Sequence, residues 1–252
     1  MPELFDQKPK RRYGCWYSAA LILVALAVAC YFAVCAISEA ANRMHCANQI
    51  CHIALAIAVY QQVYHSFPPA YSTDRDGRPL HSWRVLILPY LGCEEVYQSI
   101  RLNEPWNSPH NRDVFQKSPD PLFYFHCCSA TNPESETSYV MIVGPNTISD
   151  GPHGARLEDI KDGCTNTIMF VEVKNSGIHW AEPRDLDFAS MSFKVNDPNG
   201  KGVGSYHRGV AGVAFVSGSV WFIRDDFDPK LLKALTTING GEDVSALEHY
   251  SR

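Results

Sequence analysis

The segment CWYSAALILVALAVACYFAVCAI, residues 15–37, decides the fold of this 252-residue chain. It contains 23 residues and no charged side chain. A helix of this length spans about 35 Å, which is enough to cross the hydrocarbon core of a bilayer. The apolar core of a secretory signal peptide is usually only about 7–15 residues long and precedes a small-residue cleavage site. The segment therefore favours an uncleaved transmembrane helix over a cleaved signal peptide or a lipoprotein signal ending at Cys30.

The distribution of basic residues around this segment predicts its orientation. Four basic side chains precede it, namely Lys8, Lys10, Arg11 and Arg12, and only Arg43 is found in the twenty residues after it. Cytoplasmic flanks of membrane helices are enriched in Lys and Arg. We therefore expect a cytoplasmic tail (1–14), a span in contact with membrane lipid (15–37) and an exported domain (38–252). This organisation corresponds to a single-pass protein of the inner membrane with a periplasmic domain.

Composition limits the remaining possibilities. Apolar residues make up 46% of the chain, enough for one sizeable core beside the membrane segment. The formal net charge is −5 and no basic stripe is present, which argues against a nucleic-acid partner.

The helical pattern continues beyond the membrane segment. Small and apolar residues recur at three- and four-residue spacing between residues 40 and 58, while Glu39, Arg43 and Asn48 lie on the other side. One helix over about residues 16–64, ended by Phe67-Pro68-Pro69, explains this pattern most simply. Its second half is amphipathic, so it must pack against the rest of the chain.

The remainder of the chain changes from helical to strand patterns. Short helices are predicted over residues 82–100 and a surface loop over 103–121, which is rich in Pro, Asn and Asp. Strands are predicted at 139–143, 167–173, 178–180, 210–216 and 220–223, the last two joined by Ser217-Gly218. Asp228-Pro229 then begins a short helix. A long helix followed by mainly antiparallel strands predicts an α+β fold.

Several blocks of sequence resemble a known family. They include EAANRMHCANQI (39–50), SFPPAY (66–71), GRPLHSWRVLILPYL (77–91), DIKDGCTNTIMFVEV (159–173) and SYHRGVAGVAFVSGSVWFIRD (205–225). In this order they resemble the pilin-like planctomycete family catalogued as domain of unknown function number 1559. The resemblance implies a pilin-like or pseudopilin-like architecture, in which the long N-terminal helix anchors the subunit and its exported half packs on an antiparallel sheet. It implies no activity, and it implies other pilin-like subunits or a secretion or pilus machinery as partners.

The chain departs from the family pattern at two places. Members open with a prepilin cleavage point, matched here by Gly14, and carry a Glu five residues later, where this chain has Ala19. The C-terminal signature H-x9-D-G is matched by His207 and by Ser217-Gly218, so the turn is kept and its carboxylate is lost. We expect His207 to form a hydrogen bond near this hairpin turn and to fix the start of the strand that follows it.

Six of the nine cysteines would face an oxidising compartment: Cys46, Cys51, Cys93, Cys127, Cys128 and Cys164. Cys46 and Cys51 cannot pair on one helix, because about 8–9 Å would separate their Cα atoms. The family pattern places one cysteine on the helix and one in a block matched by Phe125-His126-Cys127-Cys128-Ser129. The resemblance therefore implies a Cys46–Cys127 disulfide, with free thiols or other pairings as the alternatives.

The sequence contains partial metal-binding patterns. His45 and His52 flank Cys46 and Cys51, but they would be about 10.5 Å apart along a helix, too far to share a tetrahedral zinc ion. Asp74-x-Asp76-Gly77 and Asp197-x-Asn199-Gly200 match parts of a calcium loop and lack its closing Glu. We interpret both as turns, with calcium as the less favoured alternative, and expect no cofactor.

No nucleophile elbow, phosphate loop, HExxH or CxxC motif is present in the sequence, so we expect a protein that is not an enzyme. The first functional hypothesis is a membrane-anchored pilin-like envelope protein with a structural or assembly role. The second is a monomeric envelope receptor that binds a small ligand or glycan through the loops at residues 103–136 and 181–204.

Overall fold

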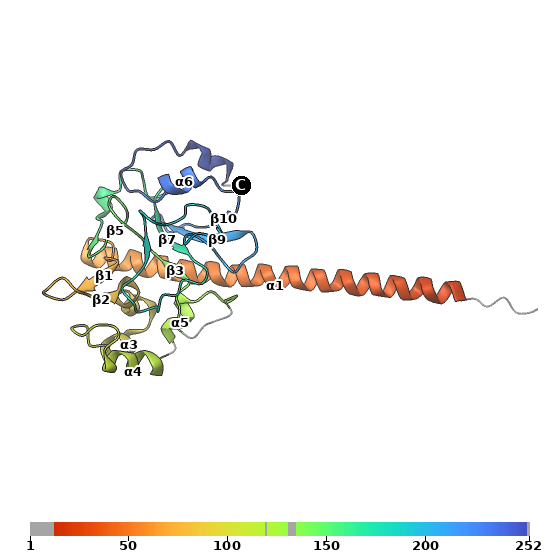
Figure 1. Cartoon of the computed structure of the whole chain (residues 1–252), viewed down its shortest axis with the longest axis horizontal. Helices are drawn as coiled ribbons and strands as arrows, with labels where there is room; N and C mark the ends of the chain where they lie inside the picture. Colours follow the sequence, from red (N-terminus) through yellow and green to blue (C-terminus); the bar gives the residue numbers. More distant parts are fainter. Residues whose placement is uncertain (1–12, 119, 131–134, 251–252) are drawn as a thin grey trace, which may run out of the picture. The chain divides into compact units, whose positions relative to one another are not determined.

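The computed structural model describes residues 13–118, 120–130 and 135–250. The basic residues of the predicted cytoplasmic tail lie outside this part of the chain. Helix α1 (Tyr13–Tyr64) contains 52 residues, which confirms the predicted long N-terminal helix. The chain divides into two compact units, Met1–Asn42 and Arg43–Arg252. We call the second of these the globular unit; Figure 1 labels many of its elements.

The described part of the first unit belongs entirely to α1. Its large apolar side chains are 48–70% exposed, for example Leu21, Phe32 and Ile37. Among the described residues, the part of α1 that begins at Ala20 is the one helix long and apolar enough to cross a membrane.

The chain that follows α1 forms a hairpin and several short helices. These elements are β1 (Tyr71–Thr73), β2 (Pro79–Ser82), α2 (Trp83–Leu86), the 3₁₀ helix η1 (Leu88–Leu91), α3 (Glu94–Ser99), α4 (Pro109–Lys117) and α5 (Asp120–Phe125). The prediction of a surface loop over residues 103–121 is therefore wrong from Pro109 onward, where α4 and α5 form, while residues 103–108 lie outside helices and strands. Helix α4 forms because Pro109 occupies its first turn and the Ser108 hydroxyl accepts a hydrogen bond from the Asn111 N–H.

The strands form two four-stranded sheets beside the β1–β2 hairpin. The first has the order β10-β9-β7-β3 and is antiparallel throughout; the second has the order β6-β5-β4-β8 and is mixed. Their bounds are β3 (Tyr139–Val140), β4 (Ile142–Val143), β5 (Ser149–Asp150), β6 (His153–Gly154), β7 (Ile168–Glu172), β8 (Leu186–Asp187), β9 (Val210–Phe215) and β10 (Val220–Arg224). The remaining helices are η2 (Leu157–Asp159), α6 (Pro229–Ala234) and η3 (Ser245–His249).

Two predicted strands differ from the structure for identifiable reasons. The strand predicted at residues 139–143 is divided between the two sheets, because the Met141 N–H donates to the Asp185 carboxylate instead of to a neighbouring strand. The strand predicted at 178–180 is only an isolated bridge between Glu136 and His179. Its backbone is engaged locally, since the His179 N–H donates to the Glu182 side chain.

The second half of α1 packs against the antiparallel sheet. Ile50, Ile53 and Ile57 are fully buried, in one cluster with Phe170 of β7 and Ala214 of β9. Gly212 of β9 permits this approach, because a Cβ atom there would lie 2.6 Å from Ile50 Cδ1. Figure 1 shows α1 passing beside β7 and β9. The α+β class with a long N-terminal helix is therefore confirmed.

An aromatic group of the core includes a histidine. The His179 ring centroid lies 4.8 Å from that of Trp106 and 6.0 Å from that of Trp180. Its Nδ1 accepts a hydrogen bond from the Ala181 N–H at 3.1 Å, so the ring is held neutral. Burial lowers the pKa of His179 to about 4, with Glu182 acting in the opposite direction and Arg84 and Arg112 adding to the decrease.

We expect this histidine to make the globular unit sensitive to acid. Its pKa is lower in the folded state than the ordinary 6.5, so its stabilising contribution is present above pH 6.5 and is lost as the pH falls towards 4. His179→Asn keeps an acceptor for the Ala181 N–H and removes the titration. In thermal unfolding of the full chain in detergent, the variant should show a smaller decrease of Tm over this pH range. An unchanged pH dependence would contradict the assignment.

Candidate functional site

Four side chains with metal-ligating or redox-active atoms meet inside the globular unit. We call Cys46, Cys127, Cys128 and His207 the thiol–imidazole cluster. Cys46 Sγ lies 3.3 Å from Cys127 Sγ and 3.4 Å from Cys128 Sγ, and Cys127 Sγ lies 3.7 Å from His207 Nε2. One donor atom from each residue falls within 4.8 Å of all the others. Cys128 is exposed, while the other three are at most 1% exposed.

Three separate segments position these four residues. Cys46 lies on α1 one turn before Ile50, on the face of the helix that is buried. The Cys127 N–H, just after α5, donates to the Ser138 hydroxyl at 3.0 Å. The His207 N–H, in the loop before β9, donates to the Ser205 hydroxyl at 3.0 Å. The cluster therefore links α1 to the loop after α5 and to the loop that precedes β9.

The cluster has a polar and electrostatically coupled environment. The hydrogen bond between the two thiols lowers the pKa of Cys46 and raises the pKa of Cys127. Glu172 of β7 accepts hydrogen bonds from Ser205 Oγ at 2.6 Å and from the Gly212 N–H at 2.9 Å. Burial raises the pKa of this carboxyl group. Ser205 thus connects Glu172 to the backbone of His207.

Two kinds of chemistry are open to this arrangement. Cys46 and Cys127 are both free thiols, and their sulfur atoms are farther apart than the roughly 2.05 Å of a disulfide bond. The structure thus brings the two predicted partners together, and the disulfide itself stays a prediction. Three sulfur atoms and one imidazole nitrogen are also a donor set suited to a metal ion.

The other histidines and the hairpin residues lie elsewhere. His45 and His52 pack against the rings of Phe123 and Tyr124, at centroid distances of 5.7 and 6.1 Å. Ser217 and Gly218 form the turn between β9 and β10, where Gly218 has a φ of 84°. His207 lies at the opposite end of β9, so its ring faces Cys127 and not this turn. Gly14 is within the first turn of α1.

The two calcium-like segments are turns held by their own carboxylates. Asp74 Oδ1 accepts hydrogen bonds from the backbone N–H groups of Asp76 and Arg78. Asp197 accepts from the Ser192 hydroxyl at 2.7 Å and from the Asn199 N–H at 3.0 Å. These interactions match the interpretation of both segments as turns.

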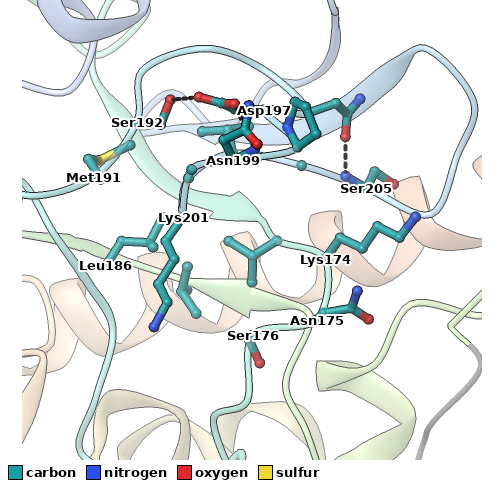
Figure 2. A pocket seen from close by; sticks show the side chains of 18 of the residues that line it. Lys174, Asn175, Ser176, Leu186, Met191, Ser192, Asp197, Asn199, Lys201 and Ser205 are labelled. Atoms are coloured by element: carbon teal, nitrogen blue, oxygen red, sulfur yellow. Dashed lines mark hydrogen bonds between the residues drawn. The ribbon is translucent and has the colours of Figure 1, made fainter.

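A cavity of about 1090 Å³ opens beside the cluster. The segments 173–178 and 184–209 supply most of its lining. The second segment includes His207 of the thiol–imidazole cluster, so the cluster lies at the wall of the cavity. Figure 2 shows Lys174 and Lys201 on different sides of the cavity, with the Ser192–Asp197 hydrogen bond along its rim. Its lining mixes Lys, Arg, Asp, amide and hydroxyl groups with apolar side chains such as Val173 and Met191. Of residues 103–136, predicted as part of a binding surface, none that the structure describes lines this cavity.

Sequence analysis missed the combination of Cys128 and His207 with Cys46. The adjacent residues His126, Cys127 and Cys128 did mark a sulfur-rich segment. No spacing rule connects His207 to Cys46, because the two residues meet only after α1 has packed beside β9. His126 does not complete the set; its Nδ1 lies 3.4 Å from the Glu136 carbonyl oxygen.

In the described part of the chain, an α+β unit follows one helix that is long and apolar enough to span a membrane. This arrangement is compatible with a membrane-anchored envelope protein. Residues 36–155 match the family model described as "Protein of unknown function (DUF1559)", which confirms the family resemblance. No curated protein and no solved structure matches the chain significantly.

Proposed function

We propose that this chain is a non-enzymatic, membrane-anchored envelope protein of pilin-like or pseudopilin-like type with a structural or assembly role. In this proposal residues 15–37 lie in the inner membrane, the N-terminus is cytoplasmic and the globular unit is periplasmic. The observation that carries the proposal is that a single helix, α1, contains both the apolar segment and the residues that fill the core. Such a helix can attach the domain to the membrane and present it to neighbouring subunits.

An exposed apolar stripe on α1 supports an assembly role. Met44 and Leu55 are 70% and 65% exposed, and Cys51 is exposed between them. Their spacing of seven and four residues places all three on one side of the helix. We call these residues the α1 stripe. Copies anchored in parallel in one membrane carry the α1 stripe at the same distance from the bilayer. We therefore propose that a second copy of the chain binds to this stripe.

The test combines mechanical release with a variant. Subunits of an assembly should be recovered in high-molecular-weight material sheared from cells, and oxidation should cross-link Cys51 between copies. Leu55→Glu should leave Tm nearly unchanged and remove the chain from the sheared fraction, because a charge then occupies the stripe. Recovery of the wild-type chain only in the membrane fraction would contradict the assembly role.

An N-terminus at Cys15, read by mass spectrometry, would indicate cleavage after Gly14, whereas Met1 or Pro2 would indicate a plain anchor.

A second candidate is a monomeric envelope receptor for a small polar ligand or glycan. The cavity lined by residues 184–209 favours it, since this range overlaps the loop predicted to bind a ligand. The Glu that pilin-like relatives carry after the cleavage point is also replaced by Ala19, which removes a contact used in filament assembly. Thermal-shift screening against a glycan panel should give a response that Lys201→Ala reduces. A flat response across the panel would count against this candidate.

A further inference from the structure

We propose that Cys46, Cys127, Cys128 and His207 form a Cys3His site for one structural zinc ion. This assignment is independent of the proposed role in the envelope, because it concerns what holds the globular unit together. It also differs from the disulfide implied by the family pattern, which would use only two of the four side chains.

The distances fit a tetrahedral ion. With zinc–sulfur bonds of about 2.3 Å, neighbouring donor atoms of a tetrahedron lie about 3.7 Å apart. Three of the six donor separations are 3.3 Å for Cys46–Cys127, 3.4 Å for Cys46–Cys128 and 3.7 Å for Cys127–His207, and all six are within 4.8 Å. Pairs at the upper end of this range must close by about 1 Å around the ion. The two sulfur pairs need to open by only a few tenths of an ångström to accept the ion. A Cys46–Cys127 disulfide would instead require the pair to close by more than 1 Å.

The donor types select the metal. Thiolate ligands favour zinc over magnesium or calcium, and three thiolates with one imidazole are a common structural zinc set. Four protein ligands complete the tetrahedron, so no position is left for water or substrate. The site is therefore assigned a stabilising and not a catalytic function, in keeping with a chain that carries no catalytic motif.

The surrounding hydrogen bonds hold two ligands in place without the ion. The Ser138 hydroxyl fixes the backbone at Cys127, and the Ser205 hydroxyl fixes the backbone at His207. Outer contacts of this type orient the ligands of metal sites. Cys128 is exposed, so the ion can reach the site from solvent. Binding converts the ligating thiols to thiolates and releases their protons to the solvent.

The mechanical consequence is a cross-link between distant segments. Cys46 and Cys127 are 81 residues apart in sequence, and His207 is a further 80 residues along the chain. One ion would tie α1, the loop after α5 and the start of β9 to a single point. Loss of the ion should therefore destabilise the attachment of α1 to the rest of the globular unit.

The decisive variant is Cys128→Ser. It removes one of the four ligands of the zinc site, yet it leaves both partners of the predicted disulfide intact. Cys128 is exposed, so the substitution should not prevent folding. Cys51→Ser is the matched control, because Cys51 is also an exposed cysteine but lies outside the cluster.

The measurements use the full chain purified from membranes in detergent, without added reductant or chelator. We expect one zinc per chain by elemental analysis and, after exchange with Co²⁺, the absorption bands of tetrahedral cobalt with thiolate ligands. Zinc should also slow alkylation of Cys128 and raise Tm, and Cys51→Ser should retain all of these properties. Cys128→Ser should lower the zinc content at least tenfold and lose the cobalt bands.

Two results would overturn the assignment. One is a chain that contains no zinc although it is produced with zinc, whether Cys46 and Cys127 are reduced or joined in a disulfide. The other is a zinc content that Cys128→Ser leaves unchanged, which would place the ion elsewhere. His207→Gln removes another of the four ligands and should also lower the zinc content. For each variant, a cooperative thermal unfolding transition shows that the chain has folded.

Discussion

Replacing Asp185 by alanine is expected to lower the free energy of unfolding of the globular unit by about 3–5 kcal/mol, because it leaves a buried guanidinium without its counter-charge. Asp185 Oδ1 lies 2.8 Å from Arg84 Nη1, and the two side chains are 1% and 0% exposed. The same oxygen accepts hydrogen bonds from Trp83 Nε1 and from the Met141 N–H. Arg84 also donates to the carbonyl oxygens of Trp180 and Arg184.

Two variants separate charge from hydrogen bonding at this position. Asp185→Asn retains an acceptor oxygen for all three donors, so its cost should be clearly smaller than that of Asp185→Ala. Asp226→Ala is the control for an exposed pair: it removes the contact with Arg224, whose side chain is 72% exposed, and should cost less than about 1 kcal/mol. Chemical denaturation followed by tryptophan fluorescence measures all three, since Trp83 and Trp180 are buried. Equal costs for Asp185→Ala and Asp226→Ala would contradict this role of the pair.

This buried pair also explains one limit of sequence-based prediction. A continuous strand over residues 139–143 matches the local sequence, but Asp185 lies 44 residues away from Met141 and takes the N–H at the middle of that strand. The strand therefore divides between two sheets. No local propensity contains this information, because it depends on a tertiary contact.

Other elements were predictable because their signals are local. The apolar run and the three- and four-residue spacing define α1 from end to end. Asp228-Pro229 predicts the start of α6, where the Asp228 side chain accepts a hydrogen bond from the Lys230 N–H. Ser108-Pro109 is the same kind of signal. The high Pro, Asn and Asp content of residues 103–121 outweighed it and led to the wrong prediction of a loop instead of α4.

The candidate site was only partly predictable for the same reason. The family pattern pointed to Cys46 and Cys127, which the structure places 3.3 Å apart. It did not point to His207 as their neighbour, because its signature relates His207 to a turn at the far end of β9. Helical geometry argued against a shared ion at His45 and His52, which the structure places against the rings of Phe123 and Tyr124, but it could not identify ligands on other segments.

Replacing Ile57 by alanine is expected to cost about 2–5 kcal/mol, since it removes a buried side chain from the contact between α1 and the sheet. Ile57 is fully buried in the core cluster. The matched control is Leu55→Ala, two residues earlier on the same helix. Leu55 is 65% exposed, so its truncation should change stability by no more than about 0.5 kcal/mol.

The comparison isolates packing because the two substitutions are otherwise alike. Both replace a large aliphatic residue by alanine in the interior of α1, and alanine has the higher helix propensity in both cases. A difference in unfolding free energy therefore measures the burial of Ile57. If both variants were equally stable, α1 would not be part of the core, and the helix would serve only as a tether. A large loss of unfolding free energy for Ile57→Ala, together with no loss for Leu55→Ala, would distinguish the two faces of α1. The face with Ile57 completes the core, and the face with Leu55 remains available for a neighbouring copy.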